Sequence, residues 1–510
     1  MMICEVFMKR VKYIIIFVIF ILGLLLFLFL LRGPQGRGGM PMTPPVKVSY
    51  PEMDKNALYE ERIFDSSYVH EINVKISNKD WEDLKANPLA KKKYAVDVVI
   101  DGIKFKNVSF KTKGNSSLKN IAEGPAEGPA SNRYSFKIDF GKYEKGQNYY
   151  GLDFLNLNNI YGDASYLNDY VSYEIFRKIG IPAPLTSFTY VKINGQNLGL
   201  YSAVEEVGES FYDRNNLEGF LYKPEQTGGR DFGSSLTYIN DSEDNYIDIF
   251  NNAESIISKN DKTRLINSLK QLNSYQNLEI VLDTEEIIRY FVAHNFVLSY
   301  DSYTGKSIHN YYLIENQGRL SMIPWDYNLA FGRYNMTEDI STIVNYGIDS
   351  PLHRCEENNR PMWKWIISNE KYRTMYHKLM NEMIVSVFDS GYIYQFIDDE
   401  YNIIKPYVEL DFSAFYTPQQ VETAVSTLKK FIQYRAESIH LQLDGKLSTR
   451  TSEQINENRI NASSIQLSDL GFIADDSLKQ SNNDNSSSSD KHHSKKDNSN
   501  LESNEQKNTN

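Results

Sequence analysis

The sequence predicts an α+β fold in which a strand-rich first half is followed by a helical second half. In the first half, alternating apolar residues flank the turns Asp101-Gly102 and Asn194-Gly195, a pattern typical of β-hairpins. In the second half, apolar residues recur at helical spacing, most clearly over 372–387. We therefore expect a sheet-dominated part, one inserted helix and then a helical part.

Composition excludes several classes of protein. The chain has 510 residues and a formal net charge of −11. This acidic balance argues against nucleic acid as a partner, because phosphate binding needs concentrated Lys and Arg. The two cysteines, Cys4 and Cys355, exclude a disulfide scaffold and a zinc site built from CxxC pairs.

The N-terminus contains an uncharged apolar segment at residues 13–31. As a helix it would span about 28 Å, close to the thickness of a hydrocarbon core. Lys9, Arg10 and Lys12 precede it, which predicts that residues 1–12 are cytoplasmic. We expect a single-pass transmembrane anchor with the large domain outside the cytoplasm; a cleaved signal peptide is the alternative.

Two segments of biased composition flank the expected folded domain at 65–447. Residues 32–64 are rich in Gly and Pro and predict a linker. Residues 448–510 are rich in Ser, Asn, Asp and Lys. They contain too few apolar groups to offset the entropy of ordering, so we expect a disordered tail.

Local patterns locate the elements around the candidate site. Strands are expected over 68–76, 94–114, 133–140 and 185–207, with a helix over 165–179. In the second half, a helix begins at an Asp283 N-cap and ends near Ser299. A hairpin with strands 309–315 and 319–324 follows it.

Two basic features of the first half are candidate phosphate-binding groups. The loop Lys113-Gly114-Asn115-Ser116 can present backbone N–H groups to phosphate, although a plain hairpin loop is the alternative. Lys137 lies in the middle of the apolar strand 133–140. It either occupies the solvated face of that strand or reaches a buried anion.

Two acidic residues of the second half are candidates for chemistry. Asp301 follows a helix C-terminus, where a negative charge opposes the helix dipole; an Asx-turn is the alternative. Asp326 comes directly after the second hairpin strand, and Asn310 opens the same hairpin. Carboxylate and amide oxygens are suitable ligands for Mg²⁺.

The order of these features is more informative than any one of them. It runs glycine-containing loop, strand lysine, helix, hairpin, large helix, post-helical Asp, second hairpin and second Asp. Protein kinases have this order. We therefore expect an atypical protein-kinase-like two-lobed fold, with a strand-rich N-terminal lobe and a helical C-terminal lobe. The strict motifs GxGxxGxV, HRDxxxxN and DFG are absent.

Several short segments in the same order resemble the CotH family of spore coat kinases, over about residues 65–440. They are KGNSS, RYSFKIDF, LNDYVSYEIFRKIGIPAP, VKINGQNLGLYSAVEEV, DSYTG, HNYYL and IPWDYNLAFG. The resemblance implies an ATP-dependent protein serine kinase that modifies surface or spore-coat proteins. ATP and Mg²⁺ (or Mn²⁺) are the implied cofactors.

The resemblance also implies residue roles. Asp301 would accept the proton of the substrate hydroxyl, and Asp326 would bind the metal together with Asn310. Lys137 would hold the ATP phosphates. The groups expected to contact the rest of the nucleotide are Lys113, Gly114, Asn115, Ser116, Glu205 and Glu206. Asp169 and Glu174 are candidate helix partners for Lys137.

Other functions remain open at the level of sequence. Relatives that resemble this family act as surface adhesins, so a non-catalytic adhesin or coat-assembly scaffold is the alternative. A carbohydrate-active enzyme with paired carboxylates is a further alternative. For the kinase, Ser-rich proteins are the expected partners, and the chain's own Ser-rich stretch at 480–499 is one of them. The resemblance also implies association with spores.

Overall fold

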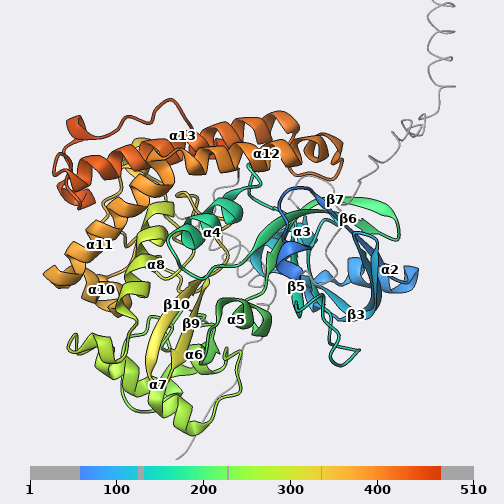
Figure 1. Ribbon diagram of the computed structural model, residues 1–510, viewed down its shortest axis with the longest axis horizontal. Helices are drawn as coiled ribbons and strands as arrows, with labels where there is room; N and C mark the ends of the chain where they lie inside the picture. The colour runs from blue at the N-terminus through green and yellow to red at the C-terminus, as the bar shows by residue number, and fades with distance from the viewer. Residues whose placement is uncertain (1–57, 125–130, 227–228, 335, 472–510) are drawn as a thin grey trace, which may run out of the picture. The chain divides into compact units, whose positions relative to one another are not determined.

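Seven strands in the first half form a closed sheet. The protein was analysed as a computed structural model, which describes residues 58–124, 131–226, 229–334 and 336–471. The neighbouring strands follow the order β1-β2-β3-β4-β5-β7-β6, and Figure 1 shows them together. Their bounds are β1 His70–Lys75, β2 Tyr94–Ile100, β3 Ile103–Lys113, β4 Ser135–Asp139, β5 Phe154–Asn158, β6 Thr186–Ile193 and β7 Gln196–Glu205.

The sheet closes because its first strand pairs with its sixth. β1 and β6 run parallel, with Ile72 opposite Val191 and Val74 opposite Ile193. The other neighbours are antiparallel. Alternate residues of the strands, such as Phe136, are buried in one apolar core, as the period-2 pattern predicts. Closure also leaves no unpaired strand edge.

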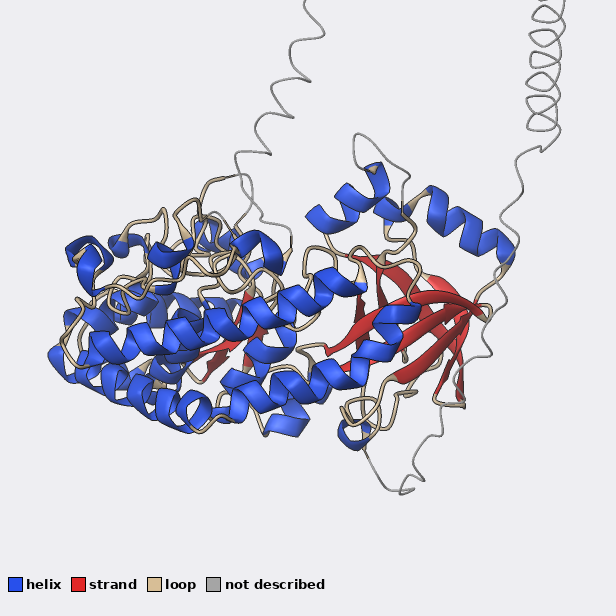
Figure 2. Cartoon of the chain, turned by 90° about the horizontal axis from the view of Figure 1, so that it is seen from above, coloured by secondary structure: helices blue, strands red, loops and turns tan. Residues whose placement is uncertain are grey.

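The second half contains most of the helices and a second sheet. Strands β8 (Phe220–Tyr222), β9 (Tyr311–Asn316) and β10 (Arg319–Pro324) pair antiparallel in the order β10-β9-β8. Figure 2 shows this small sheet among helices, apart from the closed sheet. The expected hairpin is confirmed, with Gln317 and Gly318 both at positive φ in its turn.

The helices have the following bounds. In the first half they are α2 Asn78–Ala86, α3 Ser116–Glu123, α4 Asn168–Lys178 and α5 Glu209–Asn215. In the second half they are α6 Ile247–Phe250, α7 Lys259–Leu272, α8 Thr284–Val297, α9 Ile340–Val344, α10 Pro361–Ser368, α11 Glu370–Met383, α12 Tyr392–Leu410 and α13 Pro418–Leu443. A π-helical stretch, Ile384–Asp389, continues α11.

Helix α8 is the central helix of the second half. It contacts α4, α11 and β10, and most of its residues are buried. Its N-cap is Asp283, whose side chain accepts the Glu286 N–H at 3.4 Å, as the sequence predicts. The apolar stripe of α11 is likewise buried, including Tyr376 and Met380.

The expected two-lobed, protein-kinase-like fold is wrong. The strand-rich half closes on itself into a seven-stranded sheet. In the second half, β8 adds a third strand to the expected hairpin and makes a separate sheet. The closure depends on the pairing of β1 with β6, which are far apart in the sequence. Turn residues allow hairpins to be predicted from the sequence. No comparable local pattern predicts the pairing of two strands that are far apart in the sequence.

The expected linker and tail both overlap the folded body. Tyr59 and Phe64, from the expected linker, are buried in the core around the closed sheet. Ala462, Ile465 and Leu470, from the expected disordered tail, are buried in the core of the second half. Their apolar side chains are widely spaced among polar residues, so average composition concealed them. The tail prediction is therefore wrong for residues 448–471.

The expected membrane anchor at 13–31 and the segment before it lie outside the described residues. Within the four described ranges, none of the helices combines the length and the apolar character needed to cross a membrane.

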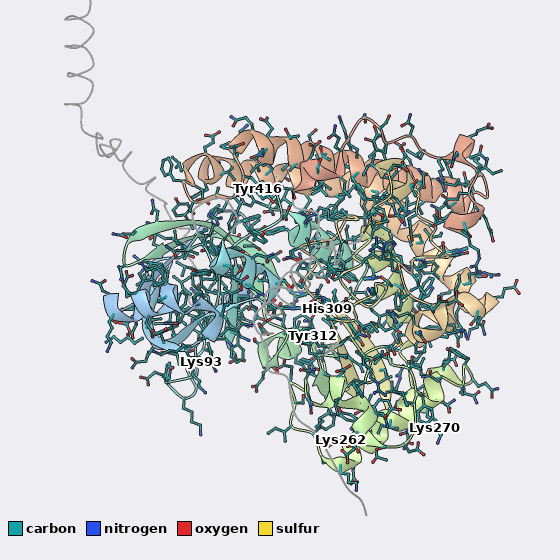
Figure 3. All side chains as sticks on the ribbon, turned by 180° about the vertical axis from the view of Figure 1, so that it is seen from behind. Lys93, Lys262, Lys270, His309, Tyr312 and Tyr416 are labelled. Carbon is teal, nitrogen blue, oxygen red and sulfur yellow. The ribbon has the colours of Figure 1, made fainter. Side chains whose placement is uncertain are left out.

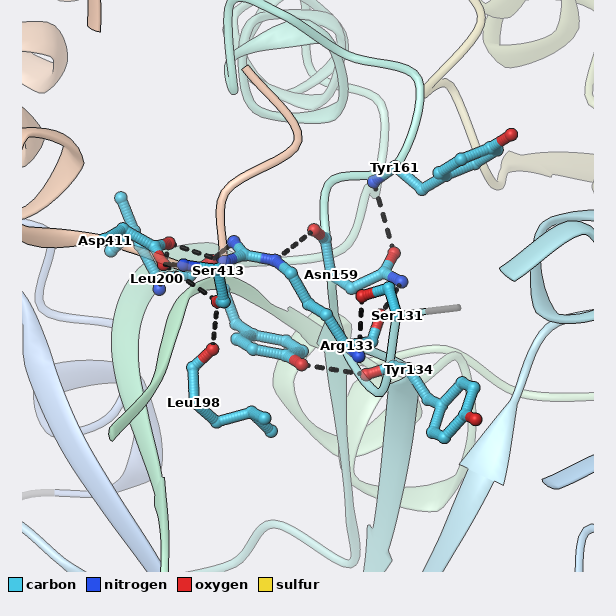
Figure 4. Close-up of polar contacts among 10 residues, drawn as sticks. Ser131, Arg133, Tyr134, Asn159, Tyr161, Leu198, Leu200, Asp411 and Ser413 are labelled. Atoms are coloured by element: carbon cyan, nitrogen blue, oxygen red, sulfur yellow. Dashed lines mark hydrogen bonds and ion pairs between the residues drawn. The ribbon is translucent and has the colours of Figure 1, made fainter. Parts of the chain in front are cut away.

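A buried arginine joins the closed sheet to the chain that follows α12 (Figure 4). Arg133 Nη1 lies 2.5 Å from Asp411 Oδ2 and donates to Ser413 Oγ at 2.8 Å. Its Nη2 donates to the carbonyl oxygen of Leu200, and its Nε donates to that of Asn159 at 3.2 Å. Asp411 also accepts the backbone N–H of Leu200 at 2.9 Å. The pair thereby connects three separate segments of the chain.

The neighbouring residue of β7 has to be a glycine. Gly199 has φ +125°, which side chains disfavour. A Cβ there would collide with the side chains of Arg133, Asp411 and Ser413. β7 therefore approaches the buried ion pair closely because this position carries no side chain.

Replacing Arg133 by alanine is expected to lower the free energy of unfolding by about 3–5 kcal/mol, because it leaves the Asp411 carboxylate buried and unpaired. Urea unfolding measures this change. The control is Arg289→Ala, since Arg289 pairs with a largely exposed Glu285 and should contribute less than about 1 kcal/mol. Equal losses for the two variants would contradict the assignment.

Candidate functional site

One pocket brings together residues that are far apart in the sequence. Lys113 and Gly114, at the end of β3, line it together with Asn158 at the end of β5. Three carboxylates complete the charged part of its lining: Asp163 before α4, Asp169 in the first turn of α4, and Asp326 after β10. The pocket therefore joins the closed sheet to the helix-rich half.

Asp326 reaches the pocket through a tight turn after β10. Its φ is +55°, which is uncommon for a residue other than glycine. Its backbone N–H donates to the Tyr173 hydroxyl at 2.9 Å, which holds the turn against α4. Burial raises the pKa of the Asp326 carboxyl; the Lys113 ammonium opposes this rise and the Asp301 carboxylate adds to it. Asp301 and Asp326 are therefore electrostatic neighbours.

Asp301 is held by two residues that precede β9. Its Oδ1 lies 2.7 Å from His309 Nε2. Asn310 Nδ2 donates to Asp301 Oδ2 at 3.2 Å and to its carbonyl oxygen at 2.8 Å. Burial alone would lower the pKa of His309, but the Asp301 carboxylate raises it overall. In Figure 3, His309 lies in the middle of the molecule, near Tyr312.

Lys137 and Lys113 share Glu206 as a negative neighbour. Lys137 Nζ lies 3.2 Å from Glu206 Oε2, and Asn156 Nδ2 donates to Glu206 at 2.6 Å. Burial would raise the pKa of Glu206, but Lys137 and then Lys113 lower it overall. Lys113 Nζ donates to Asn158 Oδ1 at 2.9 Å, and burial lowers its pKa. Glu206 therefore links Lys137 to the pocket.

Three of the expected nucleotide contacts are not brought to this cluster. The Glu205 carboxylate is buried elsewhere, where it accepts the Tyr59 hydroxyl at 2.7 Å and pairs with Arg214 at 2.6 Å. Asn115 is exposed and accepts from a surface lysine, and Ser116 is exposed at the start of α3. The neighbouring Ser117 lines the pocket instead.

Within the described residues, Lys137 does not pair with either of the expected helix partners, Asp169 and Glu174. Glu174 pairs with Arg177 at 2.8 Å and accepts the Tyr392 hydroxyl at 2.5 Å. Asp169 lines the pocket near Lys113. The counter-ion of Lys137 is Glu206, which directly follows β7.

Sequence analysis missed Lys223, which follows β8. Its Nζ lies 5.4 Å from the ring centroid of Tyr312 and 5.5 Å from that of Trp325, distances that allow cation–π attraction. Its charge also lowers the pKa of both Asp326 and Glu206. No motif surrounds it; the only available signal was a lysine directly after a short apolar strand.

The charges of the pocket suit a phosphate group accompanied by a divalent cation. Among the residues that the structure describes, no group of three or more His, Cys, Asp and Glu side chains is arranged to hold a metal ion. Mg²⁺ commonly needs only one or two protein carboxylates when phosphates and water complete its shell. Asp326 and Asp169 supply two, and Asp169 Oδ1 is buried without a hydrogen-bond partner in the described chain.

The chain belongs to the CotH family. A family model described as "CotH kinase protein" matches residues 110–439, more than half of the chain. This range begins in β3, ends in α13 and includes the pocket residues described above. The resemblance expected from the short motifs is thereby confirmed.

A comparison with curated proteins identifies a particular relative. The chain is 24% identical to inner spore coat protein H of Bacillus subtilis (strain 168) over 267 residues. This alignment covers 50% of the chain and 69% of the relative.

Replacing Asp169 by asparagine is expected to raise the free energy of unfolding by roughly 1–3 kcal/mol at neutral pH without divalent cations, because the wild type must either bury this charge or protonate the carboxyl on folding. Burial and the Asp326 charge raise the pKa of Asp169. The folded protein thus binds more protons than the unfolded chain above pH ~4, and stability falls as the pH rises.

Urea unfolding at several values between about pH 5 and pH 8 measures this effect. The stabilisation of Asp169→Asn over the wild type should grow as the pH rises. A difference that stays constant across this range would contradict the electrostatic account.

Proposed function

We propose that this chain is an ATP-dependent protein kinase that phosphorylates serine side chains. The observation that carries the proposal is the convergence of lysines and acids on one pocket: Lys113 and Asp326 line it, Lys137 is linked through Glu206, and Asp301 is adjacent. Phosphoryl transfer needs mainly positioned charges and one proton acceptor. The description of the matching family, "CotH kinase protein", supports the same activity.

Asp301 would act as the proton acceptor. In the proposed step, the serine oxygen bonds to the γ-phosphorus of ATP as the bond from that phosphorus to the ADP oxygen breaks, and the serine proton passes to the Asp301 carboxylate. His309 and Asn310 contact the two different oxygens of that carboxylate. They would therefore fix its orientation.

The lysines would bind the phosphate chain. Lys113, Lys137 and Lys223 all act on Glu206, and Lys113 and Lys223 also act on Asp326, so all three charges would be available to one polyphosphate. Asp326 would hold Mg²⁺ or Mn²⁺, and the Asn310 amide oxygen is a second candidate, because its nitrogen donates to Asp301. A bound cation would neutralise negative charge on the phosphates. Nucleotide contacts from Gly114, Asn115, Ser116 and the β7 backbone at Glu205 remain predictions.

We also propose that the substrates are Ser-rich proteins and that the protein is associated with spores. The similarity to an inner spore coat protein supports the location. The stretch 480–499 of the chain itself contains several serines and is a candidate substrate.

Asp301→Asn is expected to lower kcat by about 10²–10⁴-fold in the transfer of labelled phosphate from ATP to a Ser-rich peptide, because the proton acceptor is lost. Asp97→Asn is the matched control: Asp97 pairs with a half-exposed Lys104, away from the pocket, and its loss should leave kcat unchanged. If the folded wild type transfers no phosphate with Mg²⁺ or Mn²⁺, a non-catalytic scaffold or adhesin becomes the better description.

Incubation of the full chain with ATP and Mn²⁺ is expected to add phosphate to serines within 480–499. Mass spectrometry of proteolytic peptides measures it, and Asp301→Asn, which lacks the proton acceptor, serves as the negative control. An unmodified tail in an enzyme that phosphorylates the peptide would remove the tail from the set of substrates.

A further inference from the structure

Asp169 is a buried carboxylate with few hydrogen-bond partners. Only 8% of the residue is exposed, and its Oδ1 is buried without a partner in the described chain. The carboxylate accepts the Tyr327 backbone N–H, and a long contact of 3.5 Å joins Oδ2 to Asn158 Nδ2. Burying a charged oxygen without a partner is costly. Such a group in a native structure calls for an explanation.

The capping of α4 does not explain Asp169. The task belongs to Asp163, whose Oδ2 accepts the Asn168 N–H at 2.9 Å and whose Oδ1 accepts the Ser165 N–H at 3.0 Å. The first of these bonds satisfies the N–H of the first residue of α4, as a capping carboxylate does. Both carboxylates line the pocket. Asp163 accepts N–H bonds on both of its oxygens, whereas Asp169 Oδ1 has no partner in the described chain.

Pairing with a lysine does not explain Asp169 either. The ion pairs within the described ranges include none between Asp169 and a basic side chain. The Lys113 ammonium attracts Asp169, but it donates to Asn158 at 2.9 Å and also acts on Asp326 and Glu206. The buried Arg333 also attracts Asp169, but it acts on Asp163 as well. The pocket lining itself contains three carboxylates, those of Asp163, Asp169 and Asp326, and one ammonium, that of Lys113.

We infer that Asp169 is the second protein ligand of a divalent cation held by Asp326. The sequence predicted Asp169 only as a possible partner of Lys137. The two carboxylates come from α4 and from the turn after β10, which are already joined by the bond between Asp326 N–H and the Tyr173 hydroxyl. A cation between them would pair both charges and satisfy Asp169 Oδ1. This inference rests on the proposed function, since the cation is the one that accompanies ATP.

The test measures Mn²⁺ affinity of the full chain in the presence of ADP, by the electron paramagnetic resonance signal of free Mn²⁺. Asp169→Asn should weaken Mn²⁺ binding at least about 10-fold, because a ligand is lost. Glu174→Gln is the matched control: it removes the same charge from the same helix, but Glu174 is paired with Arg177, so Mn²⁺ affinity should not change.

The double variant Asp169→Asn/Asp326→Asn sharpens the test. If both residues bind one cation, the two losses in Mn²⁺ affinity should not add, because residues that share a partner are coupled. The urea unfolding transition of each variant shows that it is folded.

The outcomes separate the inference from the proposed function. Mn²⁺ affinity that is unchanged in folded Asp169→Asn, or losses that simply add in the double variant, would overturn the role of Asp169 and leave the kinase proposal standing. A wild type that binds no Mn²⁺ with ADP and transfers no phosphate would overturn both.

Discussion

The buried ion pair between Arg133 and Asp411 is the interaction on which the site depends most. Arg133 precedes β4, and its guanidinium bonds to the carbonyl oxygens of Leu200 in β7 and Asn159 after β5. The Asn159 side chain returns a bond from its Nδ2 to the Arg133 carbonyl oxygen at 2.6 Å. β4, β5 and β7 are thus tied at one end. The same strands position residues of the site. Lys137 lies in β4, Asn158 ends β5, and Glu206 directly follows β7.

A second constraint is the distribution of charge around the pocket. Three lysines lower the pKa of Glu206. Lys113 and Lys223 lower the pKa of Asp326, and the Asp301 carboxylate raises it. Buried charges that perturb one another cluster at functional sites. In the proposed kinase the arrangement has a direct use, because a polyphosphate and its cation complete the pairing that the side chains alone leave unfinished.

Fold and chemistry separate in this protein. The expected chemistry rested on an order of motifs that protein kinases share, yet the strands close into a seven-stranded sheet and the expected fold is wrong. Lys113 and Asp326 nevertheless line one pocket, and Asp301 acts electrostatically on Asp326. Function depends on such sites rather than on the fold that carries them, and membership of the CotH family is consistent with the site.

Local patterns were enough to predict the hairpin turn at Asn194-Gly195, the N-cap at Asp283 and the acid that follows β10. These depend on neighbouring residues and on periodicity. Only the folded chain shows that the sheet closes. Only there do the adjacent Glu205 and Glu206 have different partners, since Glu205 pairs with Arg214 and Glu206 with Lys137. The partners that reach the site from distant segments of the chain also could not be predicted. Their positions depend on long-range strand pairing and burial, which no local sequence pattern encodes.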